Sequence, residues 1–125
     1  MQADFSADRP IFLQLAERLE AGIASGAYPE EAQVPSITEF SVAYGINPAT
    51  ALKGVNLLVE AGFLYKKRGL GMFVAAGARA KLLQKRRDKF IEDFVQPMFT
   101  EARHLAIDGR DLKQIIERGL SGYDN

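Results

Sequence analysis

The fold of this chain is constrained most by two sets of helix signals that lie close together in its first half. Ser36 and Glu39 have the spacing of a capping box, in which each side chain satisfies a backbone N–H group at the start of a helix. Gly45 should end that helix, and Asn47 is a good N-cap for a further helix that Gly62 closes. Two short helices separated by a tight turn that contains glycine predict a helix-turn-helix.

The segments on either side of this motif extend the pattern. Apolar residues recur at three- and four-residue steps over residues 10–25, which predicts a helix before the motif. After the motif, β-prone runs at 63–65 and 72–74 flank the basic, glycine-bearing sequence 66–71, which predicts a hairpin with a basic tip. A helix, a helix-turn-helix and a hairpin in this order predict a winged helix-turn-helix DNA-binding domain over residues 8–76.

From residue 77 onward the sequence is helical again. Residues 79–89 are strongly basic, and a wide apolar stripe follows that Pro97 should kink or divide. Asp108 is a good cap for a last helix with one apolar face. Because about fifty residues in two or three helices can hardly close a core alone, we expect residues 77–125 to be a helical dimerisation region. The alternative is that the stripe folds back on the winged helix.

The predicted fold class is therefore mainly α with a small β-hairpin: a winged helix-turn-helix followed by a short C-terminal helical dimerisation segment. The expected dimer interface consists of the apolar residues of the stripe, which are Phe90, Ile91, Phe94, Val95, Met98, Phe99 and Ala102.

The charges are distributed unevenly, although 16 Lys and Arg balance 16 Asp and Glu. Residues 1–62 carry 3 basic and 8 acidic side chains, and residues 91–125 carry 4 and 7. Residues 63–90 carry 9 basic side chains against Asp88 alone. Such a basic block is typical of a protein that binds nucleic acid or an anionic surface, and a merely solvated helix face is the alternative.

Several classes of function lack support in the sequence. The chain has no Cys, which excludes disulfides, thiolate metal sites and thiol catalysis. No apolar run approaches the roughly 18 residues of a membrane span, and residues 1–4 do not resemble a signal peptide, so we expect a cytoplasmic protein without a membrane partner. His104 shares a helical stretch with Glu101 and Asp108, but an ordinary surface or interface histidine explains it better than a metal site. We expect no metal, no cofactor and no enzymatic activity.

The helix that follows Asn47 is the candidate recognition helix, because the second helix of such a motif enters the major groove of DNA. If its apolar residues face the core, its outer face carries Ala49, Thr50, Lys53 and Asn56. Thr50 could bond a phosphate or touch a thymine methyl, and Lys53 could reach guanine. A solvated Lys53 and a Thr50 that serves only the first helical turn are the alternatives. In the hairpin, glycines would let the backbone approach DNA while Lys66, Lys67 and Arg68 supply charge.

Taken together, these motifs resemble the GntR family of transcriptional regulators over residues 10–74. The matching segments are Pro10–Ala16, Gly26, Pro35-Ser36, Gly45–Thr50, Glu60–Leu64 and Arg68–Val74. The Asn-Pro-x-Thr start of the recognition helix, the R-G-x-G-M-F-V wing and the short helical tail resemble the YtrA-like branch. The resemblance implies a regulator, expected to be a repressor, that acts as a homodimer on a palindromic operator of double-stranded DNA.

The resemblance also implies a set of DNA-contacting residues. They are Ser36, Asn47, Ala49, Thr50, Lys53, Lys67, Arg68, Gly69, Leu70 and Gly71, with Thr38 where the family usually has a DNA-contacting Arg. The usual Pro-Gly turn before them falls on Glu30-Glu31. Both departures predict weaker DNA binding or a different operator preference. A winged-helix module that binds only protein, and a basic helix over 79–99 that lies on a membrane surface, are the alternative functions. No effector is evident.

Overall fold

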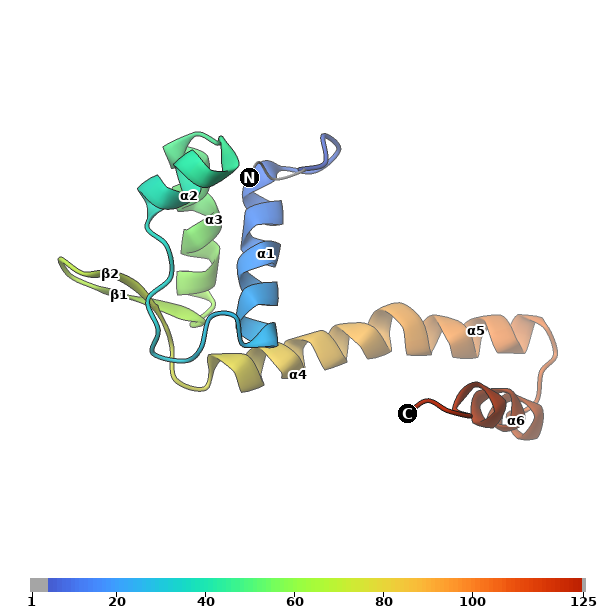
Figure 1. Ribbon diagram of the computed structural model, residues 1–125. Coiled ribbons are helices and arrows are strands. Elements are labelled where there is room, and N and C mark those ends of the chain that lie inside the picture. The colour runs from blue at the N-terminus through green and yellow to red at the C-terminus, as the bar shows by residue number, and fades with distance from the viewer. Residues whose placement is uncertain (1–4, 125) are drawn as a thin grey trace. The chain divides into compact units, whose positions relative to one another are not determined.

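The computed structural model describes residues 5–124, and its packing divides the chain into a unit that ends at Lys85 and a unit that begins at Arg86. The first unit starts with three helices, α1 (Ile11–Ser25), α2 (Ile37–Tyr44) and α3 (Pro48–Glu60). An antiparallel hairpin of β1 (Leu64–Lys67) and β2 (Gly71–Val74) follows, and then α4 (Ala78–Phe90) starts (Figure 1). This arrangement confirms the predicted fold class of a mostly helical winged helix with a small hairpin.

The core of the first unit is built where α1 packs against α3. Leu15, Leu19 and Ile23 of α1 are each at most 2% exposed and lie in one cluster with Val55 and Leu58 of α3. They follow the three- and four-residue steps that predicted α1, so the apolar stripe faces this cluster. The helix itself begins one residue later than predicted, because Pro10 is its N-cap.

Gly54 permits the close approach of these two helices. A Cβ at this position would lie 2.8 Å from the backbone oxygen of Phe12 and 3.3 Å from the Cβ of Leu15. A backbone atom cannot move aside as a flexible side chain can, so any larger residue would push α1 and α3 apart. No pattern in the sequence predicts this role for Gly54.

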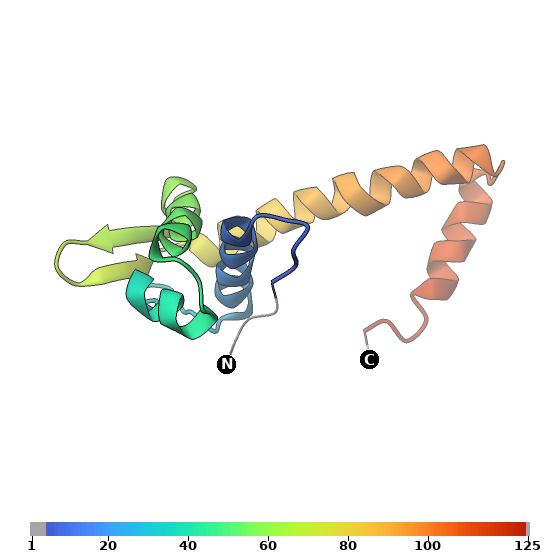
Figure 2. The same cartoon turned by 90° about the horizontal axis from the view of Figure 1, so that it is seen from above.

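The wing contains a third extended segment besides the hairpin. Gln33 forms a β-bridge with Phe73, and hydrogen bonds from Val34 N to Met72 O and from Val74 N to Ala32 O attach the segment 32–34 to β2. Figures 1 and 2 show that the hairpin nevertheless extends beyond the helices towards its tip. The strands are also longer than predicted, because Lys66 and Lys67 belong to β1 and only residues 68–70 form the turn.

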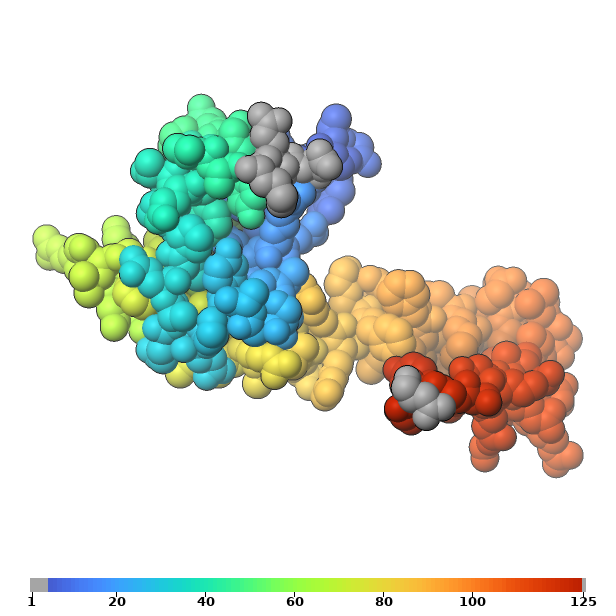
Figure 3. Space-filling model, viewed as in Figure 1, coloured from blue at the N-terminus to red at the C-terminus, as the bar shows by residue number. Residues whose placement is uncertain are grey.

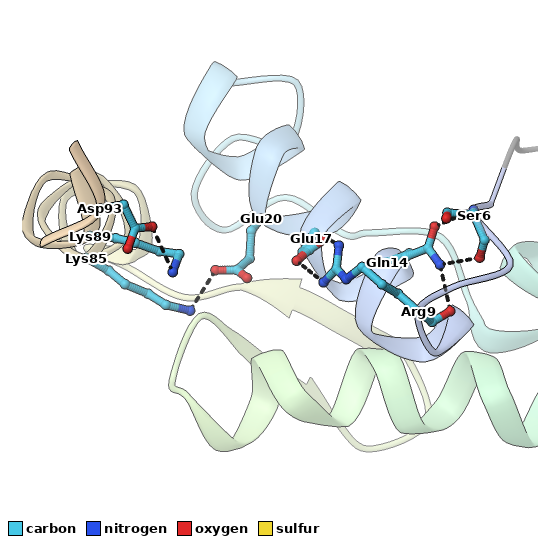
Figure 4. Close-up of polar contacts among 8 residues, drawn as sticks. All are labelled: Ser6, Arg9, Gln14, Glu17, Glu20, Lys85, Lys89 and Asp93. Atoms are coloured by element: carbon cyan, nitrogen blue, oxygen red, sulfur yellow. Dashed lines mark hydrogen bonds and ion pairs between the residues drawn. The ribbon is translucent and has the colours of Figure 1, made fainter. Parts of the chain in front are cut away.

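Polar contacts attach the residues before α1 to the N-terminal half of that helix. The Gln14 side chain is 9% exposed, accepts a hydrogen bond from Ser6 N and donates to Ser6 O and Arg9 O. Arg9 also forms an ion pair with Glu17 at 2.6 Å (Figure 4). These contacts attach the residues that precede α1 to the helix itself.

The division between the units falls within α4, later than the boundary expected at residue 77. Ala78 and Leu82 are fully buried in the core of the first unit, which explains why the start of α4 belongs to it. The second unit continues with the π-helical segment η1 (Ile91–Val95), α5 (Gln96–His104) and α6 (Gly109–Gly119). Pro97 lies at the start of α5, directly after η1, and the backbone stays helical from α4 through η1 into α5, so the predicted division into two helices is not found; the irregularity is the π-helical segment before Pro97.

Within residues 5–124, none of the helices combines the length and the apolar composition that a membrane span needs.

Candidate nucleic-acid interface

The candidate interface is built on the helix-turn-helix of α2 and α3. At the start of α2, the Ser36 hydroxyl oxygen accepts a hydrogen bond from Glu39 N at 3.0 Å, and the Glu39 carboxylate accepts one from Ser36 N at 2.9 Å. These hydrogen bonds lower the pKa of Glu39 from its ordinary value. The predicted capping box is therefore confirmed, and it fixes the direction in which the chain enters α2.

A short turn orients α3 relative to α2. Gly45 adopts a left-handed conformation with φ 64°, and the Ser41 hydroxyl donates to Ile46 O at 2.6 Å. The Asn47 side chain then accepts a hydrogen bond from Ala49 N at 2.8 Å, which caps α3. Asn47 and Ala49 are thus held together at the start of the candidate recognition helix.

The faces of α3 are divided as the sequence predicted. Ala51, Val55 and Leu58 are buried. The exposed residues of the opposite face are Ala49, Leu52, Lys53, Asn56 and Glu60, while Thr50 is half-buried. Leu52, for which the sequence offered no role, is 45% exposed on this face.

Lys53 has a partner within the protein. Its ammonium nitrogen lies 4.1 Å from the centre of the Phe12 ring of α1, a cation–π distance. Sequence reasoning could not find this contact, because the two residues are on different helices. A base contact by Lys53 would require its ammonium group to leave the ring.

The wing presents a second group of predicted residues. Arg68 and Gly69 are exposed in the turn, and Leu70 is 63% exposed. Lys67 is exposed on β1, with its ammonium nitrogen 4.7 Å from the centre of the Phe73 ring. Figure 3 shows this wing protruding from the first unit. The structure therefore brings Lys67 and Arg68 together on a projecting hairpin.

The basic block divides between the wing and α4. Arg79 donates a hydrogen bond to Ala24 O at the end of α1, and Lys85 forms an ion pair of 3.0 Å with Glu20 (Figure 4). These two cations of α4 contact α1 instead of extending the charge of the wing tip. From the sequence alone, the basic residues of 63–90 are expected to form a single positively charged surface.

The loop before α2 accommodates the acidic pair Glu30-Glu31. Glu31 has a left-handed φ of 67°, a conformation that favours glycine, at the turn where the GntR resemblance expects Pro-Gly. Its carboxylate accepts a hydrogen bond from the Tyr65 hydroxyl at 2.6 Å, and this bond raises the pKa of Tyr65. Thr38, which replaces the usual Arg, is exposed on α2.

The second unit leaves most of the predicted dimer residues exposed. Phe90, Ile91, Phe94 and Phe99 are 38–67% exposed, and Val95 and Met98 are half-buried. Ala102 differs, because it is 6% exposed and already buried in a single chain. Ile115 and Ile116 of α6 and its C-cap residue Leu120 are also exposed.

The three residues weighed as a metal site, Glu101, His104 and Asp108, do not form one cluster. His104 Nδ1 lies 3.9 Å from the Glu101 carboxylate, while Asp108 caps α6 by accepting a hydrogen bond from Asp111 N. Within residues 5–124, no group of three or more His, Cys, Asp or Glu side chains could hold a metal ion.

Sequence comparison relates the chain to helix-turn-helix regulators. No protein-family model matches it. It is similar to the HTH-type transcriptional regulator YhcF of Bacillus subtilis, with 20% identity over 122 residues that cover 98% of this chain and 99% of YhcF. It is 32% identical over 75 residues to the HTH-type transcriptional repressor NagR of the same organism. That match covers 60% of this chain and 31% of NagR, so the chain spans about a third of that relative.

Structural comparison gives the same result. A transcriptional regulator assigned to the GntR family from Bacteroides thetaiotaomicron has a TM-score of 0.75 and 29% identity, and the match covers 90% of this chain and 98% of that chain. The DNA-binding domain of AraR, solved in complex with operator ORX1, has a TM-score of 0.53 and 29% identity over 60% of this chain and 92% of that chain.

These homologues and structural neighbours are transcriptional regulators and not enzymes. Together they relate the chain to DNA-binding helix-turn-helix transcriptional regulators, with a GntR-family regulator among its structural neighbours. They do not favour the alternative of a winged-helix module that binds only protein.

Proposed function

We propose that this regulator binds a specific operator as a homodimer and represses transcription, with α3 in the major groove and the wing on the flanking backbone or minor groove. The observation that carries the proposal is the combination of an exposed outer face of α3 and a projecting wing with Arg68 in its turn, both in one compact unit. The AraR domain bound to its operator supports DNA as the ligand of this fold.

Each proposed contact has a role that its position allows. The contact set is Ser36, Thr38, Asn47, Ala49, Thr50, Lys53, Lys67, Arg68, Gly69, Leu70 and Gly71. Because the Ser36 hydroxyl accepts its cap hydrogen bond through oxygen, its hydrogen is free to be donated to a phosphate. Lys67 and Arg68 provide charge to the wing, and the exposed Ala49 lets the backbone of α3 come close to the bases.

We propose that a second copy of the chain buries the exposed apolar residues of the second unit in a dimer interface. Phe90 and Phe94 are 56% and 67% exposed, with their ring centres 5.8 Å apart, which is a large apolar surface for a single chain. A two-fold dimer would bind a palindromic operator whose half-sites lie about one helical turn, roughly 34 Å, apart.

The finer assignments are also proposals. The R-G-x-G-M-F-V wing and the short helical tail support the YtrA-like branch, and the similarity to the repressor NagR supports repression. We propose no catalytic role, no cofactor and a cytoplasmic location, where DNA is accessible to the protein.

Selection of bound fragments from genomic DNA with the purified full chain tests this function. We expect enrichment of an inverted repeat. We also expect the affinity to fall steeply with salt concentration on a log-log plot, because the Lys and Arg side chains of the protein displace counterions from the phosphates. Replacing Arg68 with Ala should weaken binding to every sequence and reduce the salt slope by about one. Enrichment of no sequence, or an affinity indifferent to salt, would contradict the proposal.

A further inference from the structure

The side chain of Gln33 connects the loop before α2 to the tip of the wing. Its amide nitrogen, Nε2, donates a hydrogen bond of 2.6 Å to the carbonyl oxygen of Leu70, 37 residues further along the chain. The backbone of Gln33 is fixed by its β-bridge with Phe73, so the side chain extends from a defined position. The loop before α2 is thereby attached to the wing at two places, at β2 and near the tip of the wing.

Gly71 is shaped to receive this amide. Its φ of 119° is rarely adopted by residues with a side chain, and a Cβ at this position would lie 2.8 Å from Gln33 Nε2. The Gln33 amide therefore occupies the space that a side chain at residue 71 would need. This role differs from the one expected from the sequence, in which the glycines only let the wing approach DNA.

The wing tip has little else to define it. The turn is closed by a hydrogen bond of 2.9 Å from Leu70 N to Lys67 O. Gly69 has a φ of 79° with nothing within 4 Å of an added Cβ, and Leu70 is 63% exposed. The segment 32–34 pairs with β2 as far as Met72, and only the end of the hairpin beyond it is two-stranded. Since a two-stranded hairpin alone is only marginally stable, an attachment near the turn should affect how Arg68 is presented.

We propose that Gln33 is a positioning residue for DNA binding, which holds the wing tip in its binding conformation before DNA arrives. The inference rests on the proposed function, because it requires Arg68 to contact DNA. A tip that is already ordered avoids the entropy loss of ordering a loop on binding, so the hydrogen bond would increase affinity without touching DNA.

Four variants of the full chain test this role by operator affinity and thermal unfolding. Gln33→Met keeps the length of the side chain but removes its donor, and Arg68→Ala removes the proposed DNA contact. The double variant Gln33→Met/Arg68→Ala completes a cycle. Tyr65→Phe is the matched control, because it deletes the hydrogen bond of 2.6 Å from Tyr65 to Glu31, which joins the same loop to β1 away from the tip.

We expect Gln33→Met to weaken operator binding about two- to tenfold, the effect of one neutral hydrogen bond, with an unchanged thermal midpoint. Tyr65→Phe should stay within about twofold of the unaltered chain. In the Arg68→Ala background, Gln33→Met should have little further effect, because the positioned contact is already gone. Faster hydrogen exchange at Leu70 N in free Gln33→Met would report the loosened tip directly.

Other outcomes overturn the inference. Unchanged affinity in Gln33→Met, or losses that add fully in the double variant, would mean that Gln33 does not act through Arg68. A thermal midpoint that falls in step with affinity would assign Gln33 a purely structural role. Normal binding by Gln33→Met beside weakened binding by Arg68→Ala would overturn the inference alone, whereas failure of the unaltered chain to bind any DNA would overturn the proposed function as well.

Discussion

The first unit buries its apolar side chains within one chain, whereas the second unit leaves most of them exposed. Leu15, Leu19 and Ile23 are at most 2% exposed in the first unit, and helices and strands cover them from several sides. In the second unit, Ala102 is the only buried residue among residues 86–124. Similar amphipathic patterns in the two units thus have different outcomes, because only the first unit contains enough elements to cover its own apolar faces.

The basic side chains of the two units also differ in what they contact. In the first unit, Arg79 of α4 donates a hydrogen bond to Ala24 O and Lys85 forms an ion pair with Glu20, both on α1; in the second, Lys89 forms an ion pair of 3.1 Å with Asp93. Lys67 and Arg68 remain on the projecting wing. We therefore expect substitutions in the first unit to alter folding or DNA contacts, and substitutions in the second to alter association.

The largest effect should come from breaking association in the second unit. Phe94→Glu places a charge on a side chain that is 67% exposed, so the chain should still fold but the dimer should dissociate. Losing the second half-site contact should weaken operator binding about 10²- to 10⁴-fold. Analytical ultracentrifugation and binding assays would measure both. A variant that stays dimeric would show that another surface holds the two copies together.

The next largest effect should be on the folding of the first unit. Leu19→Ala removes a side chain that is 2% exposed in the α1–α3 cluster and should lower the free energy of unfolding by about 2–5 kcal/mol. Chemical denaturation of this region, with Phe99→Ala as the counterpart in the second unit, measures the difference. If Phe99→Ala destabilised the first unit as much as Leu19→Ala, the two regions would not be independent.

The sequence was informative where structure depends on neighbouring residues. The capping box of Ser36 and Glu39 and the Asn47 cap are both set by residues within about one helical turn. The faces of α3 followed from helical periodicity. Such features can be predicted because the interacting atoms are close together in the chain, whatever the rest of the fold does.

The features that the sequence did not reveal join residues far apart in the chain. Gly54 matters because α1 approaches it, and the Gln33 amide reaches Leu70 only after the wing has folded against the loop. The position of Lys53 over Phe12 likewise depends on how α1 packs against α3. Each of these depends on tertiary geometry, for which a single sequence provides no spacing rule.

The contact between Lys53 and the Phe12 ring leads to a prediction for Lys53→Ala. This substitution should weaken DNA binding by about 1–3 kcal/mol at every operator sequence. Because the ammonium group lies 4.1 Å from the Phe12 ring, we expect a phosphate contact and a salt slope reduced by about one. Lys113→Ala, an exposed lysine of the second unit, is the matched control and should leave the slope unchanged. Loss confined to particular base pairs would instead mean that Lys53 leaves Phe12 and contacts guanine.

A smaller effect should follow from removing helix caps in the two units. Ser36→Ala deletes the cap of α2 and should cost about 1 kcal/mol of stability in the first unit. Asp108→Ala deletes the cap of α6, where the carboxylate accepts a hydrogen bond from Asp111 N, and should leave unfolding of the first unit unchanged. Denaturation followed by hydrogen exchange resolves the two units. Equal losses of protection in α2 for both variants would contradict the division.

The smallest effect should be the dependence of this cap on pH. Glu39 accepts the hydrogen bond from Ser36 N, which lowers its pKa in the folded state, so its contribution to stability is present above the ordinary pKa of Glu and is lost as pH falls through the lowered value. The difference in unfolding free energy between the unaltered chain and Glu39→Gln should therefore be greatest near neutral pH and shrink in acid. Because the carboxylate is exposed, solvent screens it and the change should be modest. A difference that grew as the pH fell would mean that protonated Glu39 stabilises α2, contrary to the capping geometry.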